Sequence, residues 1–447
     1  MSGFWPHDEQ LLKAVLDWSY RRIVAGQDPM TSARPAAELR AAAGSTVTPD
    51  GIGGFEALRI FTQTLLPATR AQDNEMNLAY VPAATTEAAL VFDLAVSAAE
   101  VFGGHWDAGA GAIYAENEAL DWIVGLLGWP ETAGGCFVSG GTIGNLSALT
   151  AAREKARREG RGAPWRLVAS EDAHSSVASA ARVLDATVLA VPTDDGGRLR
   201  AAAVAEALAG EPPDGVFAVV ASAGTTNSGA VDELDGLADV CAEHGLWLHV
   251  DGAYGGAALC APSVRDRFAG VERADSFIVD PHKWLFAPYD CCALLYREPE
   301  HAVAAHTQSA SYLDTVSRAE RNPSDLAIHL SRRVRGLPLW FSLATYGTDR
   351  YRSAVEHVLT LARRVAEEIR SLPHLELVLE PELSVVLFRR VGWDLDDYTA
   401  WSTRNARAGI VLCLPTRWRG EPVLRLCFVN PDTAFDRVRA VLESLAR

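Results

Sequence analysis

Between about residues 136 and 297, short apolar runs alternate with stretches whose apolar residues recur every three or four positions. Short apolar runs are typical of buried strands, and the periodic stretches are typical of helices that cover a sheet. The alternation therefore predicts an α/β fold with a mostly parallel sheet flanked by helices. The expected strands are 136–138, 166–169, 187–191, 216–222, 246–250, 276–279 and 292–296, and the expected helices are 142–158, 176–184, 201–209 and 233–243.

The pattern changes on either side of this region. The first 75 residues look helical and contain turns with proline and glycine, so we expect them to wrap a neighbouring subunit. The C-terminal part indicates a smaller α+β domain, with a helix at 349–371, strands at 375–379, 384–389 and 424–429, and a helix at 433–445. We therefore expect a helical dimerisation segment at 1–75, a large ligand-binding domain at 76–345 and a small C-terminal domain at 346–447.

The charge balance excludes two classes of partner. The chain of 447 residues has 41 basic and 57 acidic side chains and a formal charge of −16. An acidic surface repels nucleic-acid phosphates and anionic lipid headgroups, so we expect neither nucleic acid nor a membrane as a partner. The start of the chain does not resemble a secretory signal, and no apolar run approaches the roughly 20 residues that cross a bilayer. We therefore expect a cytoplasmic protein.

The seven cysteines are scattered, odd in number and include no Cys-x-x-Cys pair. This spacing favours reduced, buried thiols over a disulfide framework or a structural zinc site. No metal site is therefore expected.

Lys283 follows the expected strand 276–279 directly, in the sequence SFIVDPHKW. Ligands of open α/β sheets bind beyond the carboxyl ends of the strands, so this lysine is expected at the ligand edge. We expect burial there to lower the lysine pKa, because the ammonium form loses water, and a neutral amine can attack an aldehyde. A lone lysine in a turn is more often a surface residue, so its neighbours decide between the two interpretations.

Asp251 ends another apolar run, in LWLHVDGAYG. A carboxylate at a strand end can pair with the N–H of a pyridinium ring and so keep that ring an electron sink. The small residues Gly252 and Ala253 leave room for a flat ring. The alternative is an aspartate that caps the following turn.

The turn SGGTIGN at 139–145 connects a strand to a helix. Its backbone N–H groups and the hydroxyls of Ser139 and Thr142 are suited to hold a phosphate. The turn lacks the G-x-G-x-x-G and Walker lysine patterns, which argues against a dinucleotide or a nucleoside triphosphate. Glycine-rich turns are common, so this signal is weak by itself.

Three more residues follow expected strands: His174 in EDAHSS, and Thr225 and Thr226 in SAGTTNSG. An imidazole at this edge can stack on an aromatic cofactor and face a substrate carboxylate, and the threonines can reach the ring. A lone histidine is more often the neighbour of a helix cap. Four strand ends together nevertheless supply a phosphate cup, a stacking imidazole, an acid for a pyridinium and an amine.

The segments EDAHSS, AGTTNSGAVDEL, HVDGAYGG and DPHKWLFAPYDC resemble the pyridoxal-dependent group II amino-acid decarboxylases of fold type I. This family includes the aromatic amino-acid, histidine and glutamate decarboxylases. The likeness runs from about residue 5 to the C-terminus and includes YVPAATT at 80–86 and LSRRVRGLPLWFSL at 330–343. It implies pyridoxal 5′-phosphate as the cofactor and a homodimer whose active sites lie at the subunit interface.

The resemblance also implies roles for individual residues. Lys283 is expected to hold the cofactor aldehyde as an imine, Asp251 to pair with the pyridine nitrogen and His174 to stack on the ring. Ala253 is expected on the opposite face of the ring, and Thr226 near the ring oxygen. The expected cofactor-binding set is Ser139, Gly141, Thr142, His174, Thr226, Asp251, Ala253, Asp280, His282 and Lys283. The residues expected on the substrate side are Tyr80, Val81 and Trp106.

The phosphate end of this set contains an acid. The resemblance places Gly141, Thr142, Asp280 and His282 around the phosphate, and Asp280 then needs neighbouring donors to avoid repelling it.

One departure from the family pattern bears on the product. In the aromatic members, a tyrosine on a mobile loop protonates the carbanion after CO₂ leaves, and a phenylalanine there accompanies oxidative formation of an aldehyde. Counting back from Arg332 and Arg333 places Pro323 near that position, and no tyrosine lies between Tyr312 and Arg332. Either another group, such as His174 or a loop residue of the partner subunit, gives the proton, or the outcome differs.

We therefore predict decarboxylation of an L-amino acid to the amine and CO₂. The same cofactor also supports decarboxylation-dependent oxidative deamination to an aldehyde, or β-elimination. A catalytically silent cofactor-binding scaffold is a further alternative, against which the intact Lys283, Asp251 and His174 argue. The choice between aromatic and aliphatic substrates stays open, because Val81 and Ala83 are small and the other subunit is expected to complete the pocket.

Overall fold

The computed structural model describes residues 7–25, 33–210, 215–308 and 319–446. Within these residues, the largest sheet has seven strands in the order β1-β7-β6-β5-β4-β2-β3. Strand β7 is antiparallel to both of its neighbours, so the other six strands share one direction. The strands are β1 (Gly134–Val138), β2 (Trp165–Ser170), β3 (Ala186–Val191), β4 (Val216–Ser222), β5 (Trp247–Asp251), β6 (Ser276–Val279) and β7 (Cys292–Tyr296).

Helices cover both faces of this sheet, and consecutive strand residues contribute to different apolar clusters. Val219 packs in the cluster that includes α5, α8 and α9, while Val220 packs in the one that includes α6, α7 and α11. This arrangement explains why β4 is buried along its whole length. The predicted α/β architecture is confirmed. The helices are α5 (Trp106–Leu127), α6 (Gly141–Arg158), α7 (Ser175–Val183), α8 (Ala201–Ala209), α9 (Leu234–His244) and α11 (Glu300–His306).

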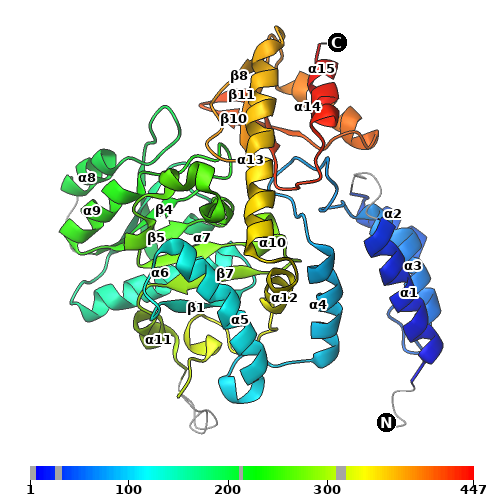
Figure 1. The fold of residues 1–447 in the computed structure, drawn as a ribbon, viewed down its shortest axis with the longest axis horizontal. Coiled ribbons are helices and arrows are strands. Elements are labelled where there is room, and N and C mark those ends of the chain that lie inside the picture. The colour runs from blue at the N-terminus through cyan, green and yellow to red at the C-terminus, as the bar shows by residue number, and fades with distance from the viewer. Residues whose placement is uncertain (1–6, 26–32, 211–214, 309–318, 447) are drawn as a thin grey trace.

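The C-terminal part forms a second layer of structure, joined to the large sheet by the long helix α13 (Thr348–Ser371) (Figure 1). In the described chain it contains a four-stranded antiparallel sheet in the order β10-β11-β9-β8. Tyr254 of the large sheet region bonds to Ser384 at the start of β9, which ties the two layers together. The elements are β8 (Leu375–Leu377), β9 (Val385–Arg390), α14 (Leu395–Arg407), β10 (Leu414–Trp418), β11 (Glu421–Cys427) and α15 (Phe435–Ser444).

Two C-terminal elements, β10 and α14, were not expected from the sequence. β10 reads LPTRW and is partly exposed, so it lacks the apolar run of a buried strand. α14 is mostly polar, although Asp394 and Asp397 form a capping box at its start. The capping residues were therefore the available signal for this helix.

The first part of the chain is helical as expected, with α1 (Glu9–Ala25), α2 (Ala36–Ala43) and α3 (Gly54–Ile60). These helices project from one side of the molecule (Figure 1). Within the described chain, no residue of α1 is buried. The remaining helices near the site are α4 (Glu87–Ala99), α10 (Pro281–Trp284) and α12 (Leu337–Tyr346).

No helix among the described residues combines the length and the apolar character that a membrane crossing requires. The division of the chain at residues 75 and 345 stays a prediction.

Candidate active site

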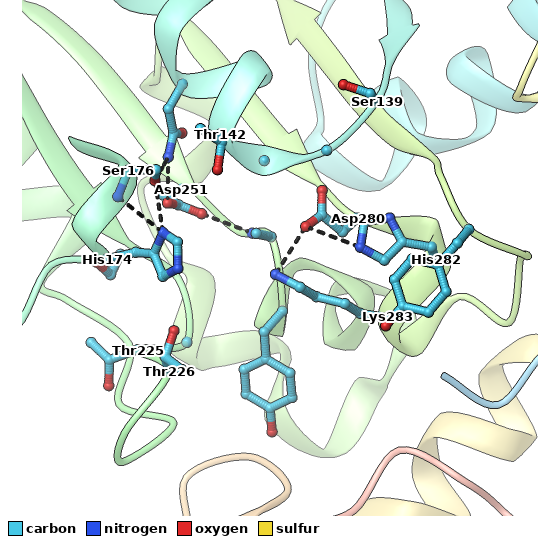
Figure 2. A pocket seen from close by; sticks show the side chains of 18 residues that line it. Ser139, Thr142, His174, Ser176, Thr225, Thr226, Asp251, Asp280, His282 and Lys283 are labelled. Atoms are coloured by element: carbon cyan, nitrogen blue, oxygen red, sulfur yellow. Dashed lines mark hydrogen bonds and ion pairs between the residues drawn. The ribbon is translucent and has the colours of Figure 1, made fainter. Parts of the chain in front are cut away.

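A cavity of about 320 Å³ lies at the edge of the large sheet where β1, β2, β4, β5 and β6 end (Figure 2). These strands run in one direction, so the residues that follow them meet at this edge. The structure brings together all of the residues expected to bind the cofactor. The cavity is lined by Ser139, Gly141, Thr142, His174, Thr226, Asp251, Ala253, Asp280, His282 and Lys283.

Lys283 lies in the short helix α10, directly after β6. Its Nζ is 2.9 Å from Oδ2 of Asp280, and its side chain is 23% exposed. Burial lowers the pKa of Lys283, but the charge and hydrogen bond of Asp280, together with the charge of Asp251, raise the pKa by more. The expected depression of the lysine pKa is therefore wrong, because a carboxylate three residues earlier compensates for the lost water.

Asp280 and His282 occupy the same end of the cavity. Asp280 is 2% exposed, and its Oδ2 also lies 3.8 Å from Nε2 of His282. Nδ1 of His282 lies 2.7 Å from the carbonyl oxygen of Cys291. Burial lowers the pKa of His282, against the opposing charge of Asp280. In the absence of a ligand, the lysine is thus the main cation beside the Asp280 carboxylate.

Asp251 ends β5 on the other side of the cavity and is 8% exposed. Its Oδ1 accepts a hydrogen bond from the backbone N–H of Ala253 at 3.0 Å. Its Oδ2 accepts one from Nδ2 of Asn145 at 2.8 Å. Both oxygens therefore have donors, which is the environment that an ionised carboxylate needs when it is buried.

His174 caps the N-terminus of α7, where its Nδ1 accepts from the backbone N–H of Ser176 at 3.2 Å. Figure 2 shows its ring at the cavity, on the side of Asp251. Thr226 is exposed there, whereas Thr225 is buried and its hydroxyl lies 2.8 Å from that of Ser228. Thr225 therefore holds its own loop together, although the two threonines seemed equivalent in the sequence.

The turn before α6 lies at the end of the cavity occupied by Asp280 (Figure 2). A Cβ at Gly141 would lie 3.3 Å from the Cβ of Ala253 and from Oδ2 of Asp280. Glycine therefore lets this turn pack closely against the cavity floor. The first amides of α6 lack partners within the helix, so they can hold an anion with the hydroxyl of Thr142.

The residues expected on the substrate side lie elsewhere in the described protomer. Tyr80, Val81 and Trp106 do not line the cavity. The carbonyl of Tyr80 accepts from Nη1 of Arg425, and the backbone N–H of Trp106 donates to Asn322. Their role at the substrate stays a prediction.

The region that replaces the family's loop tyrosine is partly described. Pro323 is buried in a single turn, Pro323–Asp325, and its carbonyl oxygen lies 3.2 Å from Nε2 of His329. Tyr312 lies outside the described residues. Pro323 therefore belongs to a packed turn and offers no proton donor.

Several cavity residues were missed by the sequence interpretation, including Asn145, Ser176, Tyr254 and Tyr289. A stronger signal for the lysine was also available. The chain has three lysines, and Lys13 and Lys155 pair with glutamates on helix surfaces. Because the chain has so few lysines, the position of Lys283 directly after a strand already distinguishes it from the other two.

The cavity fits a flat heterocycle with an aldehyde and a phosphate. It has an amine in Lys283, an acid in Asp251 and an anion-binding turn at its far end. A family model described as "Pyridoxal-dependent decarboxylase conserved domain" matches residues 58–391. The chain belongs to this family. Its cofactor is pyridoxal 5′-phosphate, and its reaction is the decarboxylation of an amino acid, which makes it a carbon-carbon lyase.

Other members of the family match almost the whole chain. The aromatic-L-amino-acid decarboxylase of Bacillus atrophaeus is 32% identical over 413 residues, which cover 89% of this chain and 86% of that protein. The L-2,4-diaminobutyrate decarboxylase of Acinetobacter baumannii is 27% identical over 409 residues, which cover 86% of this chain and 79% of that protein. The crystal structure of Oryza sativa TDC with PLP and tryptamine superposes with a TM-score of 0.90 at 25% identity, covering 99% of this chain and 98% of that one.

The pair of Asp280 and Lys283 makes the first testable prediction. Replacing Asp280→Asn removes the charge that raises the lysine pKa, so the neutral amine persists at lower pH. Visible absorbance measures the rate at which the cofactor-free protein captures pyridoxal phosphate. As the pH is lowered, we expect this rate to fall at a lower pH in Asp280→Asn than in the wild type. Asp266→Asn, an exposed substitution, serves as the control. A pH profile of capture that is identical in Asp280→Asn and wild type contradicts the assignment.

Proposed function

We propose that this decarboxylase converts an aromatic L-amino acid to its amine and CO₂ in the cavity at the strand ends. The observation that carries the proposal is the placement of the Lys283 amine and the Asp251 carboxylate on two sides of one cavity. Lys283, Asp251 and His174 are the catalytic residues on this account. The named cavity residues form the cofactor site.

The protein's part in the reaction is to hold charges and protons in place. Bound pyridoxal phosphate supplies an electron sink for the pair of electrons that the departing carboxylate leaves behind. Asp251 holds a proton at the pyridine nitrogen through its carboxylate. His174 covers the ring and faces the substrate carboxylate, while Ala253 is small enough to let the ring lie flat.

The proton that replaces the carboxylate needs a donor. Because Asp280 favours the ammonium form of Lys283, the lysine would carry a proton whenever its amine is free. Lys283 can then give this proton to the α-carbon, which completes the exchange of CO₂ for H⁺. This source does not require a tyrosine at the position of Pro323, and it supports the amine over the aldehyde as the product.

The substrate class rests on the relatives. Those at 30% identity or more are aromatic-L-amino-acid decarboxylases from Bacillus atrophaeus, Cavia porcellus and Rattus norvegicus, among others. The diaminobutyrate decarboxylase matches at 27% identity. These values support an aromatic side chain as the preferred substrate.

The direct test is a panel of L-amino acids with tryptophan, tyrosine, phenylalanine, histidine, glutamate and 2,4-diaminobutyrate. We expect CO₂ and the matching amine in equal amounts from the aromatic members, and no turnover in Lys283→Ala. Lys155→Ala, on an exposed part of α6, is the matched control and keeps the activity.

Each other outcome of this panel identifies an alternative. Aldehyde and ammonia with CO₂ indicate oxidative deamination, and a keto acid without CO₂ indicates β-elimination. A protein that binds the cofactor and turns over none of the amino acids is the scaffold. Preference for diaminobutyrate contradicts the substrate class alone.

The exposed apolar residues of the N-terminal helices support a homodimer with active sites at the subunit interface. Leu12, Leu16 and Tyr20 of α1 are 49%, 50% and 66% exposed, and Phe55 of α3 is 50% exposed. Several large apolar side chains exposed on neighbouring helices are typical of a subunit interface. The partner subunit is then positioned to complete the substrate pocket.

The dimer makes its own prediction. Leu16→Asp introduces a charge into the apolar face of α1 and is expected to shift the protein from dimer toward monomer. Light scattering after size-exclusion chromatography measures the mass. Val391→Asp changes an equally exposed apolar residue of the small domain and is expected to leave the dimer intact. A wild-type protein that elutes as a monomer refutes the proposed assembly.

A further inference from the structure

A continuous row of hydrogen bonds runs behind the cavity from β5 to His174. It begins at Trp247 and ends at Asp251 and His174, the two groups proposed to flank the ring. Figure 2 shows the end of the row at Ser176, Asp251 and His174. The successive pairs are Trp247 Nε1 and Ser276 Oγ at 2.7 Å, Ser276 Oγ and His249 Nδ1 at 2.8 Å, His249 Nε2 and Asn145 Oδ1 at 2.8 Å, Asn145 Nδ2 and Ser176 Oγ at 2.8 Å, and Ser176 Oγ and His174 Nδ1 at 2.7 Å.

Asn145 is the branch point of this row. Its Nδ2 donates both to Ser176 and to Oδ2 of Asp251, at 2.8 Å each. Asn145 is 1% exposed, so no water replaces these bonds. Turning the amide over would set its oxygen against the Asp251 carboxylate, where two acceptors repel each other. The carboxylate oxygen of Asp251 therefore decides which way the amide points.

The orientation of Asn145 decides the tautomer of His249. The oxygen of Asn145 only accepts, so Nε2 of His249 must carry a hydrogen and donate it. His249 is fully buried, and burial lowers its pKa to about 4. The neutral ring then has an unprotonated Nδ1, which accepts from the hydroxyl of Ser276, while that hydroxyl accepts from Trp247. Each donor in this half of the row has one possible acceptor.

The other branch decides the tautomer of His174. Oγ of Ser176 accepts from Asn145, so its own hydrogen is free for Nδ1 of His174. The backbone N–H of Ser176 also donates to this nitrogen, at 3.2 Å. With two donors facing it, Nδ1 of His174 carries no hydrogen. The ring proton of neutral His174 therefore lies on Nε2.

We propose that Asn145 is a positioning residue that fixes two groups through the two hydrogens of one amide: the orientation of the Asp251 carboxylate and the Nε2–H tautomer of His174. The inference deepens the proposed function, because these two groups contact the cofactor in it. Asn145 itself acts through them. A donor on Nε2 of His174 suits a ring that faces a substrate carboxylate, and a supported charge on Asp251 suits a ring nitrogen that must stay protonated.

The tautomer of His174 is measured directly by ¹⁵N NMR of the histidine-labelled full chain, with and without pyridoxal phosphate. The expected spectrum has an unprotonated Nδ1 and a protonated Nε2 for His174, assigned by comparison with His174→Gln. His249 is expected to show the same tautomer. A wild-type His174 that carries its proton on Nδ1 overturns the proposal, whatever the variants do.

Two substitutions separate the branches. Asn145→Leu removes both donors, so we expect a mixture of His174 tautomers and a cofactor affinity that is roughly tenfold to hundredfold lower, as for the loss of a hydrogen bond to a charged group. Ser176→Ala keeps the bond from Asn145 to Asp251, so the affinity is expected to stay within about twofold. It removes one of the two donors that face Nδ1 of His174 and leaves the backbone N–H, so the preference for the Nε2–H tautomer is expected to weaken. Ser147→Ala, also buried on α6, is the control and changes neither readout.

The outcomes distinguish this inference from the proposed function. If the wild-type spectrum and both variants give the expected results, they support the positioning role of Asn145 even if no amino acid is decarboxylated. Turnover of aromatic amino acids, with a His174 tautomer that is unchanged in both Asn145→Leu and Ser176→Ala, supports the function and refutes the role of Asn145. If Asn145→Leu does not fold, Ser176→Ala and the wild-type spectrum still decide.

Discussion

The active site depends on one constraint of the backbone: six strands of the large sheet point the same way. Residues that are more than a hundred positions apart, such as Thr142 and Lys283, come together because each follows the end of a parallel strand. The sheet is buried on both faces, so its strand ends are held rigidly. A rigid edge sets the separation between the Lys283 amine and the Asp251 carboxylate without a contribution from loop packing.

Electrostatics then adjusts what the geometry provides. Burial by itself lowers the pKa of Lys283, but Asp280 at 2.9 Å raises that pKa by more. On the opposite side, Asp251 accepts hydrogen bonds from two neutral donors, Nδ2 of Asn145 and the amide of Ala253. The two carboxylates of the site are therefore held in different ways. Asp280 is paired with a lysine, whereas the donors to Asp251 are a neutral side-chain amide and a backbone N–H.

The sequence was sufficient for the features that depend on apolar runs and on the residues that directly follow them. Each strand of the large sheet was expected within two residues of its observed bounds, and the residues expected to bind the cofactor line one cavity at the strand ends. The C-terminal strand β10 was missed because it is short, polar and partly exposed. Tyr80 and Trp106 could not be placed from one chain, because the second subunit is expected to complete their surroundings.

The errors and omissions at the site have a common origin. The sign of the lysine pKa shift depends on a contact with Asp280, which α10 creates by placing the two side chains three residues apart. Asn145 and His249 lie inside a helix and a strand, where a single polar residue looks like part of the core pattern. Their role follows from two hydrogen bonds of 2.8 Å, from Asn145 to Asp251 and between His249 and Asn145. A pattern of apolar and polar positions along the sequence does not reveal such contacts. The buried hydrogen-bond network behind the cavity is thus the part of the site that only the structure reveals.

The central claim is that Lys283 holds the cofactor covalently. Borohydride fixes pyridoxal phosphate to the amine that binds it, and peptide mass spectrometry then locates the label. The account predicts one label per chain, on the peptide that contains Lys283, with Lys13 and Lys155 unmodified. A label on either of those lysines, or no label in a protein that carries the cofactor, would contradict it.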